Sequence, residues 1–361
     1  MLAFYYFPQC LFICCTQFIQ LYLESILLLQ LKAKSFWHFL LISILAGFSL
    51  LTAIFHISCV FIERILLGAL IRPKPNPMVY IIGAPRSGTT RMHKLLAADQ
   101  TQFTAMRMWE LFFAPALIQK KLFRLFGKID ELFNCIFSKS IQIAEKKMFS
   151  KFNTIHSLSL FNVEEDALIL FQLFYSYHLS FLLGKEQSYS KLNRNKNIPK
   201  AVWVYYKYCI ENHQKQNPTK IYLSKNPFFT AHTTSLEELF PNIKFINMNR
   251  KIEEVAPSFF SMKKHLSFVF YGCEPSQKKY QEILELLLYW QKRGAEISSK
   301  NSIQIDYLDL KNKPSNPVER IYTFLDLPFT ISLQNRLKKE NEQSKHYTSK
   351  HKYKHGDFLK N

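Results

Sequence analysis

Residues 79–96 read VYIIGAPRSGTTRMHKLL. The apolar residues 79–82 predict a buried parallel strand, residues 83–90 predict a tight turn, and Met92, Leu95 and Leu96 fall on one face of a following helix. A strand, loop and helix in this order present successive backbone N–H groups and the positive end of a helix dipole to one phosphate-sized anion. The stretch therefore predicts an anion-binding loop after the first strand of an α/β domain.

The loop spacing is close to that of an ATP or GTP loop, G-x-x-x-x-G-K-[ST]. Gly83 and Gly88 stand at the right interval, and Thr90 stands at the Ser or Thr position. Thr89, however, replaces the lysine that reaches the β- and γ-phosphates, and Arg86 carries the positive charge in mid-loop instead. A nucleotide kinase or NTPase is therefore an alternative that lacks its main cation. An ordinary strand-to-helix turn is a second alternative, which the flanking strand and helix disfavour.

The run P-R-S-G-T-T at residues 85–90 resembles the 5′-phosphosulfate loop of sulfotransferases. These enzymes use 3′-phosphoadenosine-5′-phosphosulfate (PAPS) as co-substrate, and the resemblance implies that no metal is required. It also implies that Arg86 contacts the bridging and leaving oxygens of the donor. The residues that it assigns to the 5′-phosphate, through N–H and O–H groups, are Ser87, Gly88, Thr89 and Thr90.

A second similarity follows residues 243–248 (IKFINM), another predicted buried strand. In sulfotransferases an Arg after a later strand and a Ser eight positions on hold the 3′-phosphate, and Arg250 and Ser258 have this spacing. Arginine offers phosphate a forked, charge-assisted contact. The family's R-D-P is altered here to Arg250-Lys251-Ile252, and neither changed position is the anion ligand. The resemblance covers roughly residues 77–328 and is closest to the broad bacterial and carbohydrate-type branch.

Sulfuryl transfer needs a base for the acceptor, and the sequence offers three. Related enzymes carry a base histidine at roughly the same sequence distance from the loop as His156. Glu110 is the rival, because other branches use a Glu soon after the loop helix, and Glu165 is the third. Residues 164–166 are acidic and are also explained as the first turn of a helix capped by Asn162. Lys225 is a possible further cation or a surface lysine.

The first 71 residues are of a different kind. Residues 35–62 carry no formally charged side chain, and residues 39–62 are long enough to cross a bilayer of about 30 Å. We predict a transmembrane helix here, with a buried or interfacial helix as the alternative. Residues 1–31 are a second span or an interfacial helix. A secretory signal peptide fits poorly, because a positive n-region and a small-residue cleavage site are missing. If both segments cross, the later charges favour a cytoplasmic catalytic domain.

The pattern as a whole predicts an α/β protein. We expect a hydrophobic membrane segment (residues 1–71), a proline-rich linker (72–77), a three-layer P-loop-type domain with a mostly parallel central sheet (78–337) and a basic, His-rich tail (338–361). The net charge of +20 suits a protein that meets anions, but no nucleic-acid motif accompanies it, so we expect no nucleic-acid partner. The seven cysteines show neither metal spacing nor a disulfide framework.

These expectations lead to one reaction and leave its acceptor open. The resemblance implies transfer of a sulfuryl group from PAPS to a hydroxyl or amine of a small-molecule, lipid or glycan acceptor. Membrane anchorage makes a lipid or membrane-linked glycan attractive. The remaining alternative is a non-catalytic membrane protein with a degenerate sulfotransferase fold, which the altered R-D-P alone supports.

Overall fold

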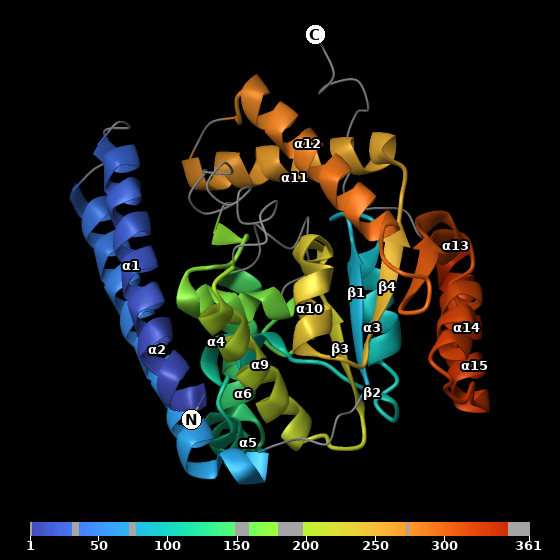
Figure 1. The fold of residues 1–361 in the computed structure, drawn as a ribbon, viewed down its shortest axis with the longest axis horizontal. Helices are drawn as coiled ribbons and strands as arrows, with labels where there is room; N and C mark the ends of the chain where they lie inside the picture. The colour runs from blue at the N-terminus through green and yellow to red at the C-terminus, as the bar shows by residue number, and fades with distance from the viewer. Residues whose placement is uncertain are drawn as a thin grey trace.

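The computed structural model describes residues 2–30, 36–71, 77–148, 159–179, 198–271 and 274–345 (Figure 1). The predictions for His156, for residues 72–76 of the linker and for the tail beyond residue 345 concern residues that lie outside the described ones.

A parallel sheet of five strands forms the centre of the domain, in the order β2-β3-β1-β4-β5. The strands are β1 (Met78–Gly83), β2 (Phe103–Thr104), β3 (Ile221–Lys225), β4 (Ile243–Asn249) and β5 (Ser302–Asp306). Because all strands run in one direction, the segments that follow β1, β3 and β4 meet at the same edge of the sheet. This confirms the predicted parallel sheet. The two-residue strand β2 is too short to leave a periodic signal in the sequence.

Alternate side chains of β1 point to the two faces of the sheet, and both faces are buried, as is typical of a central parallel strand. Val79 and Ile81 enter one apolar cluster, and Tyr80 and Ile82 enter another. The first cluster is closed by α3 (Thr89–Ala97), α13 (Tyr307–Asn312), α14 (Ser315–Phe324) and α15 (Ile331–Lys345). The second is closed by α9 (Lys200–Lys215), η2 (Pro227–His232), α10 (Thr233–Leu239), α11 (Ile252–Tyr271) and α12 (Gln277–Ala295). The predicted three-layer α/β architecture is confirmed.

Two long helices, α1 (Leu2–Gln30) and α2 (Phe36–Ile71), form an antiparallel hairpin along one flank of the domain (Figure 1). Phe7 stacks on Phe61, with ring centres 5.4 Å apart, and the hydroxyls of Tyr22 and Ser43 lie 2.8 Å apart. Two stretches, Leu2–Leu23 and Ala46–Gly68, are long and apolar enough to cross a membrane. The buried side chains of both helices belong to the same apolar cluster as Tyr80, so the hairpin packs onto the domain.

The last described helix, α15, runs to Lys345 and thus crosses the position at which the sequence suggests that the domain ends. Leu333 and Leu337 are buried in the same apolar cluster as Val79, and the Arg336 guanidinium donates to the Leu95 carbonyl oxygen at 3.1 Å. Only these two apolar residues of α15, four positions apart, face the core. The rest of the helix is mostly polar, so the sequence shows too few apolar positions to predict a helix packed on the domain.

Substitution of Gly83 should destabilise the fold. Gly83 has φ of +122°, and a Cβ there would stand 2.3 Å from the Met248 carbonyl oxygen in the neighbouring strand. We expect Gly83→Ala to lower the free energy of unfolding by at least about 2 kcal/mol, measured by urea unfolding.

Gly127 provides the matched control, because it lies in a helix and a Cβ there would have no atom within 4 Å. Gly127→Ala should raise the free energy of unfolding by about 0.5 to 1 kcal/mol. Equal stability of the two variants would contradict the close approach of β1 and β4.

Candidate active site

The loop after β1 is shaped to receive an anion. Arg86 and Gly88 both have left-handed backbone conformations, with φ of +71° and +93°, and the Ser87 N–H donates to the Ala84 carbonyl oxygen at 3.2 Å. No side chain of the described residues caps the first turn of α3. The buried Ser87 hydroxyl likewise lacks a hydrogen-bond partner in the described part of the chain. The loop therefore offers unsatisfied donors at the start of a helix.

Three residues that are far apart in the sequence meet at this loop. The Arg86 Nε donates to Ser258 Oγ at 3.1 Å, and Arg250 Nη1 donates to the Arg86 carbonyl oxygen at 2.8 Å. Arg250 follows β4, and Ser258 lies in the second turn of α11, which begins two residues later. The structure thus brings together the two anion-binding elements that the sequence suggests.

The position of Arg250 is fixed by two further neighbours. Its Nε lies 2.9 Å from Glu254 Oε2, and its guanidinium carbon lies 4.0 Å from the centre of the Tyr307 ring. The same ring would be 2.9 Å from a Cβ at Gly88, so the glycine lets α13 pack against the loop. The sequence did not indicate Tyr307, because its contacts with Arg250 and the loop come from a segment far along the chain.

Lys225, the last residue of β3, is buried and points toward the loop. Its Nζ lies 2.7 Å from Glu165 Oε1, 3.7 Å from Glu164 Oε2 and 3.4 Å from Thr90 Oγ1. Burial alone would lower the pKa of Lys225, but the carboxylates of Glu165 and Glu164 raise it above its ordinary value. The structure thus makes Lys225 a charged residue beside the loop.

Glu165 joins Lys225 to a histidine. His178 Nε2 lies 3.1 Å from Glu165 Oε2, and His178 Nδ1 lies 2.9 Å from the Ser176 hydroxyl. Burial would raise the pKa of the Glu165 carboxyl, but Lys225 and His178 hold it below its usual range. Glu165 is therefore ionised at neutral pH. A single histidine after an apolar segment carries no spacing signal, which is why the sequence did not indicate His178.

The predicted Asn162 cap is wrong. The helix η1 (Asp166–Leu173) begins later, and its N-cap position, Glu165, makes no side-chain cap. The Asn162 carbonyl oxygen instead accepts from the Met108 N–H at 2.9 Å. The acids are held by a lysine from a distant strand, which a local capping pattern cannot reveal.

Glu110 lies in α4 (Met108–Phe113), in a separate cluster. Its Oε1 is 2.8 Å from Lys120 Nζ and 3.3 Å from His213 Nδ1, and its Oε2 accepts from the Arg107 N–H at 2.9 Å. Burial would raise the pKa of Glu110, but Lys120 and His213 hold it well below its usual range. Both oxygens are engaged by residues of this cluster. His156 lies outside the described residues.

Asp166 is the centre of a buried tyrosine cluster between η1 and the sheet. Its Oδ2 accepts from the hydroxyls of Tyr206 at 2.7 Å and Tyr222 at 3.0 Å, and the Tyr206 hydroxyl lies 2.9 Å from that of Tyr80. Burial raises the pKa of Asp166 to about 6. The cluster packs η1, and with it Glu165, against β1 and β3.

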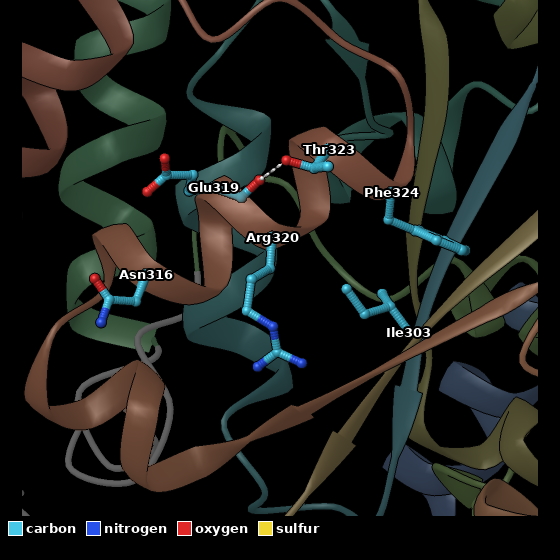
Figure 2. Close-up of a pocket in the computed structure, with 6 residues that line it drawn as sticks. All are labelled: Ile303, Asn316, Glu319, Arg320, Thr323 and Phe324. Atoms are coloured by element: carbon cyan, nitrogen blue, oxygen red, sulfur yellow. Dashed lines mark hydrogen bonds between the residues drawn. The ribbon is translucent and has the colours of Figure 1, made fainter.

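Figure 2 shows a separate depression with a volume of about 560 Å³ on the outer side of β5 and α14. Within it the Thr323 hydroxyl donates to the Glu319 carbonyl oxygen at 3.1 Å. It is open to solvent and shares no residue with the loop, so we assign it no part in the site. Its lining residues are Ile303, Asn316, Glu319, Arg320, Thr323 and Phe324. Among the described residues, no cluster of His, Cys, Asp or Glu side chains is arranged to hold a metal ion.

Comparison with known proteins gives one family. The model of the sulfotransferase family matches residues 77–330. The crystal structure of the sulfotransferase STF1 from Mycobacterium tuberculosis H37Rv is similar, with a TM-score of 0.63, 17% identity and coverage of 86% of this chain and 81% of that chain. The sulfotransferase STF9 from Mycobacterium avium is also similar, with a TM-score of 0.63, 15% identity and coverage of 81% and 75%. No curated protein matches the sequence.

Replacing Asp166 should change the pH dependence of stability. Its folded pKa of about 6 exceeds its ordinary value of 3.8, so its protonation stabilises the folded state below the lower value, and this contribution is lost as the pH rises through 6. Relative to wild type, Asp166→Asn should therefore gain about 2 kcal/mol of unfolding free energy between pH 4.5 and 7.5. Urea unfolding at both pH values measures this.

The control is Asp309→Asn, which removes an exposed carboxylate and leaves the Asp166 cluster intact. An Asp166→Asn profile parallel to that of wild type would contradict the raised pKa.

Proposed function

Because this chain belongs to the sulfotransferase family, whose model covers residues 77–330, we propose that it transfers a sulfuryl group from PAPS to a hydroxyl or amine of its acceptor. The observation that carries the proposal is the junction of Arg86, Arg250 and Ser258 beside the loop after β1. This junction places two arginines and a hydroxyl next to a helix start with free N–H groups, which suits a ligand with two anionic groups.

The residues of the loop fit the phosphosulfate end of such a donor. The uncapped start of α3, the unpartnered Ser87 hydroxyl and Thr90 provide N–H and O–H donors. Arg86 and Lys225 provide positive charge on either side of them. Arg250 and Ser258 would hold the 3′-phosphate, since the arginine is oriented by Glu254 and Tyr307. The side chains of Arg86, Lys225, Arg250 and Ser258 are thus oriented by neighbours within the domain.

The reaction would be an in-line displacement. The acceptor oxygen or nitrogen forms a bond to sulfur while the bond from sulfur to the 5′-phosphate oxygen breaks, and that oxygen leaves with the electron pair. The acceptor proton passes to a base. Lys225 and Arg86 would stabilise the negative charge on the leaving phosphate, which is greatest as the bond breaks.

The base is proposed from two candidates. His156 is suggested by resemblance, and Glu165 is the described acid that Lys225 links to Thr90 of the loop. Glu165 is ionised, and its contacts with Lys225 and His178, which lower its pKa, also reduce its basicity. Glu110 is disfavoured by its position, because its carboxylate pairs with Lys120 and His213 in a separate cluster, whereas Glu165 pairs with Lys225 beside the loop.

A nucleotide kinase or NTPase remains the rival activity. It would need an acid after a neighbouring strand to hold Mg²⁺, as well as a loop lysine. Here β4 is followed by Arg250, which donates to the loop backbone, and Thr89 occupies the lysine position. Positive charge therefore stands where the rival mechanism requires a metal-binding carboxylate.

We propose a lipid or membrane-linked glycan as the acceptor and the cytoplasm as the side of the catalytic domain. The apolar hairpin α1–α2 packed on this domain supports an acceptor found at a membrane. The free thiols of the described cysteines fit a reducing compartment.

Binding of 3′-phosphoadenosine-5′-phosphate without Mg²⁺ should raise the thermal unfolding temperature of the full chain, because a ligand that binds only the folded state stabilises it. Arg250→Ala should weaken this binding about 10- to 100-fold, since a charge-assisted contact of roughly 1.5 to 3 kcal/mol is lost. Ser258→Ala should weaken it less. Ligand titrations followed by thermal unfolding give these affinities.

Arg293, a surface residue paired with Glu296, gives the control, and Arg293→Ala should bind the nucleotide like wild type. A protein that is stabilised by Mg·ATP but not by this nucleotide would overturn the sulfotransferase proposal.

The base should be separable from the donor site. Incubation of membranes and the full chain with PAPS labelled in its sulfuryl group should place label in the lipid extract. Replacing the base should lower total transfer about 10²- to 10⁴-fold and leave nucleotide binding unchanged. The two variants to compare are His156→Ala and Glu165→Gln. The one that loses transfer but keeps nucleotide binding identifies the base.

Glu110→Gln is the comparison variant, which should keep its transfer rate per folded molecule. Full transfer by both His156→Ala and Glu165→Gln would exclude both bases. Label confined to soluble products would exclude a lipid acceptor while leaving the transferase activity in place.

A further inference from the structure

The helix α5 (Leu117–Leu132) exposes most of its large apolar side chains. Gln119 and Lys120 are buried against the domain, whereas Asp130 is covered by the start of the next helix, where it accepts from the N–H groups of Phe137 and Ser138. Lys120 pairs with Glu110, and Gln119 Nε2 lies 2.9 Å from His56 Nδ1 on α2. The outward side chains are mainly large and apolar. Burial of this face elsewhere would be strongly favourable, because apolar area removed from water gains roughly 25 cal/mol per Å².

The exposed apolar face continues onto α6 (Ile136–Met148). We call the exposed apolar residues of these two helices and their connection the α5–α6 face. They are Ile118, Leu122, Phe123, Leu125, Phe126, Ile129, Leu132, Phe133, Ile136, Phe137, Ile141 and Ile143. The exposed basic residues on the same two helices are Lys121, Arg124, Lys128, Lys139, Lys146 and Lys147, whereas Glu131 is the exposed acid. Apolar side chains interleaved with basic ones are typical of helices that lie in an anionic membrane surface.

The hairpin α1–α2 reaches this face through buried polar contacts. The N–H groups of Leu117 and Ile118, at the start of α5, donate to the Glu63 carboxylate of α2 at 2.7 and 2.5 Å. Arg64 pairs with Glu211 of α9 at 2.7 Å. The lower part of α2 is therefore fastened to the domain, and its exposed Ile62 and Leu66 adjoin the start of the α5–α6 face.

The two helical stretches that are long and apolar enough to cross a bilayer also pack along the domain. On α1, Cys10 Sγ donates to the Ala201 carbonyl oxygen, and Phe18 packs on Phe174 of the domain. Residues 19–30 extend beyond that contact, and they reach only about 18 Å at 1.5 Å per residue. A bilayer core of about 30 Å cannot be crossed by this length. A crossing would draw the domain helix α9 and η1 into lipid.

The outer side of the hairpin is nevertheless largely apolar where its side chains are described. Its exposed large side chains include Leu2, Phe4, Phe12, Ile19 and Leu23 on α1 and Ile44, Phe48, Leu51, Phe55 and Leu66 on α2. Figure 1 shows α5 and α6 beside the lower end of this hairpin, on the flank away from α14 and α15. The two apolar surfaces meet at the Glu63 contact.

We propose that this protein is monotopic: the outer side of the α1–α2 hairpin and the α5–α6 face together enter one leaflet of an anionic membrane and do not cross it. The occupant is lipid, because basic side chains accompany the apolar ones on α5 and α6 and the face is continuous with the apolar hairpin. The inference does not depend on the proposed sulfuryl transfer.

Depth-dependent quenching tests the α5–α6 face in the full chain. Phe126→Trp, at a side chain that is 62% exposed, is reconstituted with vesicles of phosphatidylcholine and phosphatidylglycerol that carry brominated acyl chains. The tryptophan fluorescence that the substitution adds should fall by roughly half or more, because interfacial helices bury their apolar face about 5 to 10 Å deep. Ile331→Trp, at a 75% exposed side chain on α15, is the matched control and should not be quenched.

Absence of quenching at residue 126 would overturn the proposal, as would equal quenching of both variants. A second copy of the chain on this face also predicts no quenching, so dimerisation is an overturning outcome. Circular dichroism of both variants confirms that they are folded before the comparison.

Labelling tests the absence of a crossing. Gln30→Cys places a thiol at the end of α1, and sealed vesicles that display the domain outside are treated with a membrane-impermeant maleimide. Opening the vesicles with a pore-forming toxin should add no labelling beyond that of wild type. New labelling that appears only after opening would show that the hairpin tip reaches the far side, and would overturn the one-leaflet proposal.

Discussion

The close contact between the end of β1 and the end of β4 is the constraint on which the site depends. A Cβ at Gly83 would stand 2.3 Å from the Met248 carbonyl oxygen, so only glycine lets the loop leave β1 directly beside β4. Arg250 follows β4 and can therefore donate to the Arg86 carbonyl oxygen, and α11 brings Ser258 to the Arg86 side chain. The anion-binding elements meet because two backbones touch.

Two buried lysine–glutamate pairs show how the same chemistry serves different ends. Lys120 and Glu110 join α4 to α5, and neither contacts the loop residues named for the donor. Lys225 and Glu165 lie at the carboxyl edge of the sheet, where Lys225 also reaches Thr90. In both pairs a lone partner would leave an uncompensated buried charge, which typically costs about 3 to 5 kcal/mol. Position at the sheet edge distinguishes the pair near the proposed chemistry from the pair that supports the fold.

Polar contacts also explain how an apolar hairpin becomes part of the domain. Glu63 takes the place of a capping residue at the start of α5, and Arg64 pairs with Glu211 on α9. These contacts fix the side of each helix that faces the domain, so the outward sides are apolar on the hairpin and on α5 alike. An acceptor held in a membrane would then be presented to a domain that rests on the same surface.

The sequence by itself determined the local features: the strand–loop–helix around Arg86, the parallel α/β architecture, and the spacing of Arg250 and Ser258. Local signals suffice there, because hydrophobic periodicity and glycine spacing are read from neighbours along the chain. Only the tertiary structure decided that Glu165 pairs with Lys225 and that the apolar side chains of α5 stay exposed. Both features depend on charges and surfaces that come from segments distant in sequence. A buried charge is tolerated only when it is paired, and the folded structure determines which residue lies close enough to pair with it.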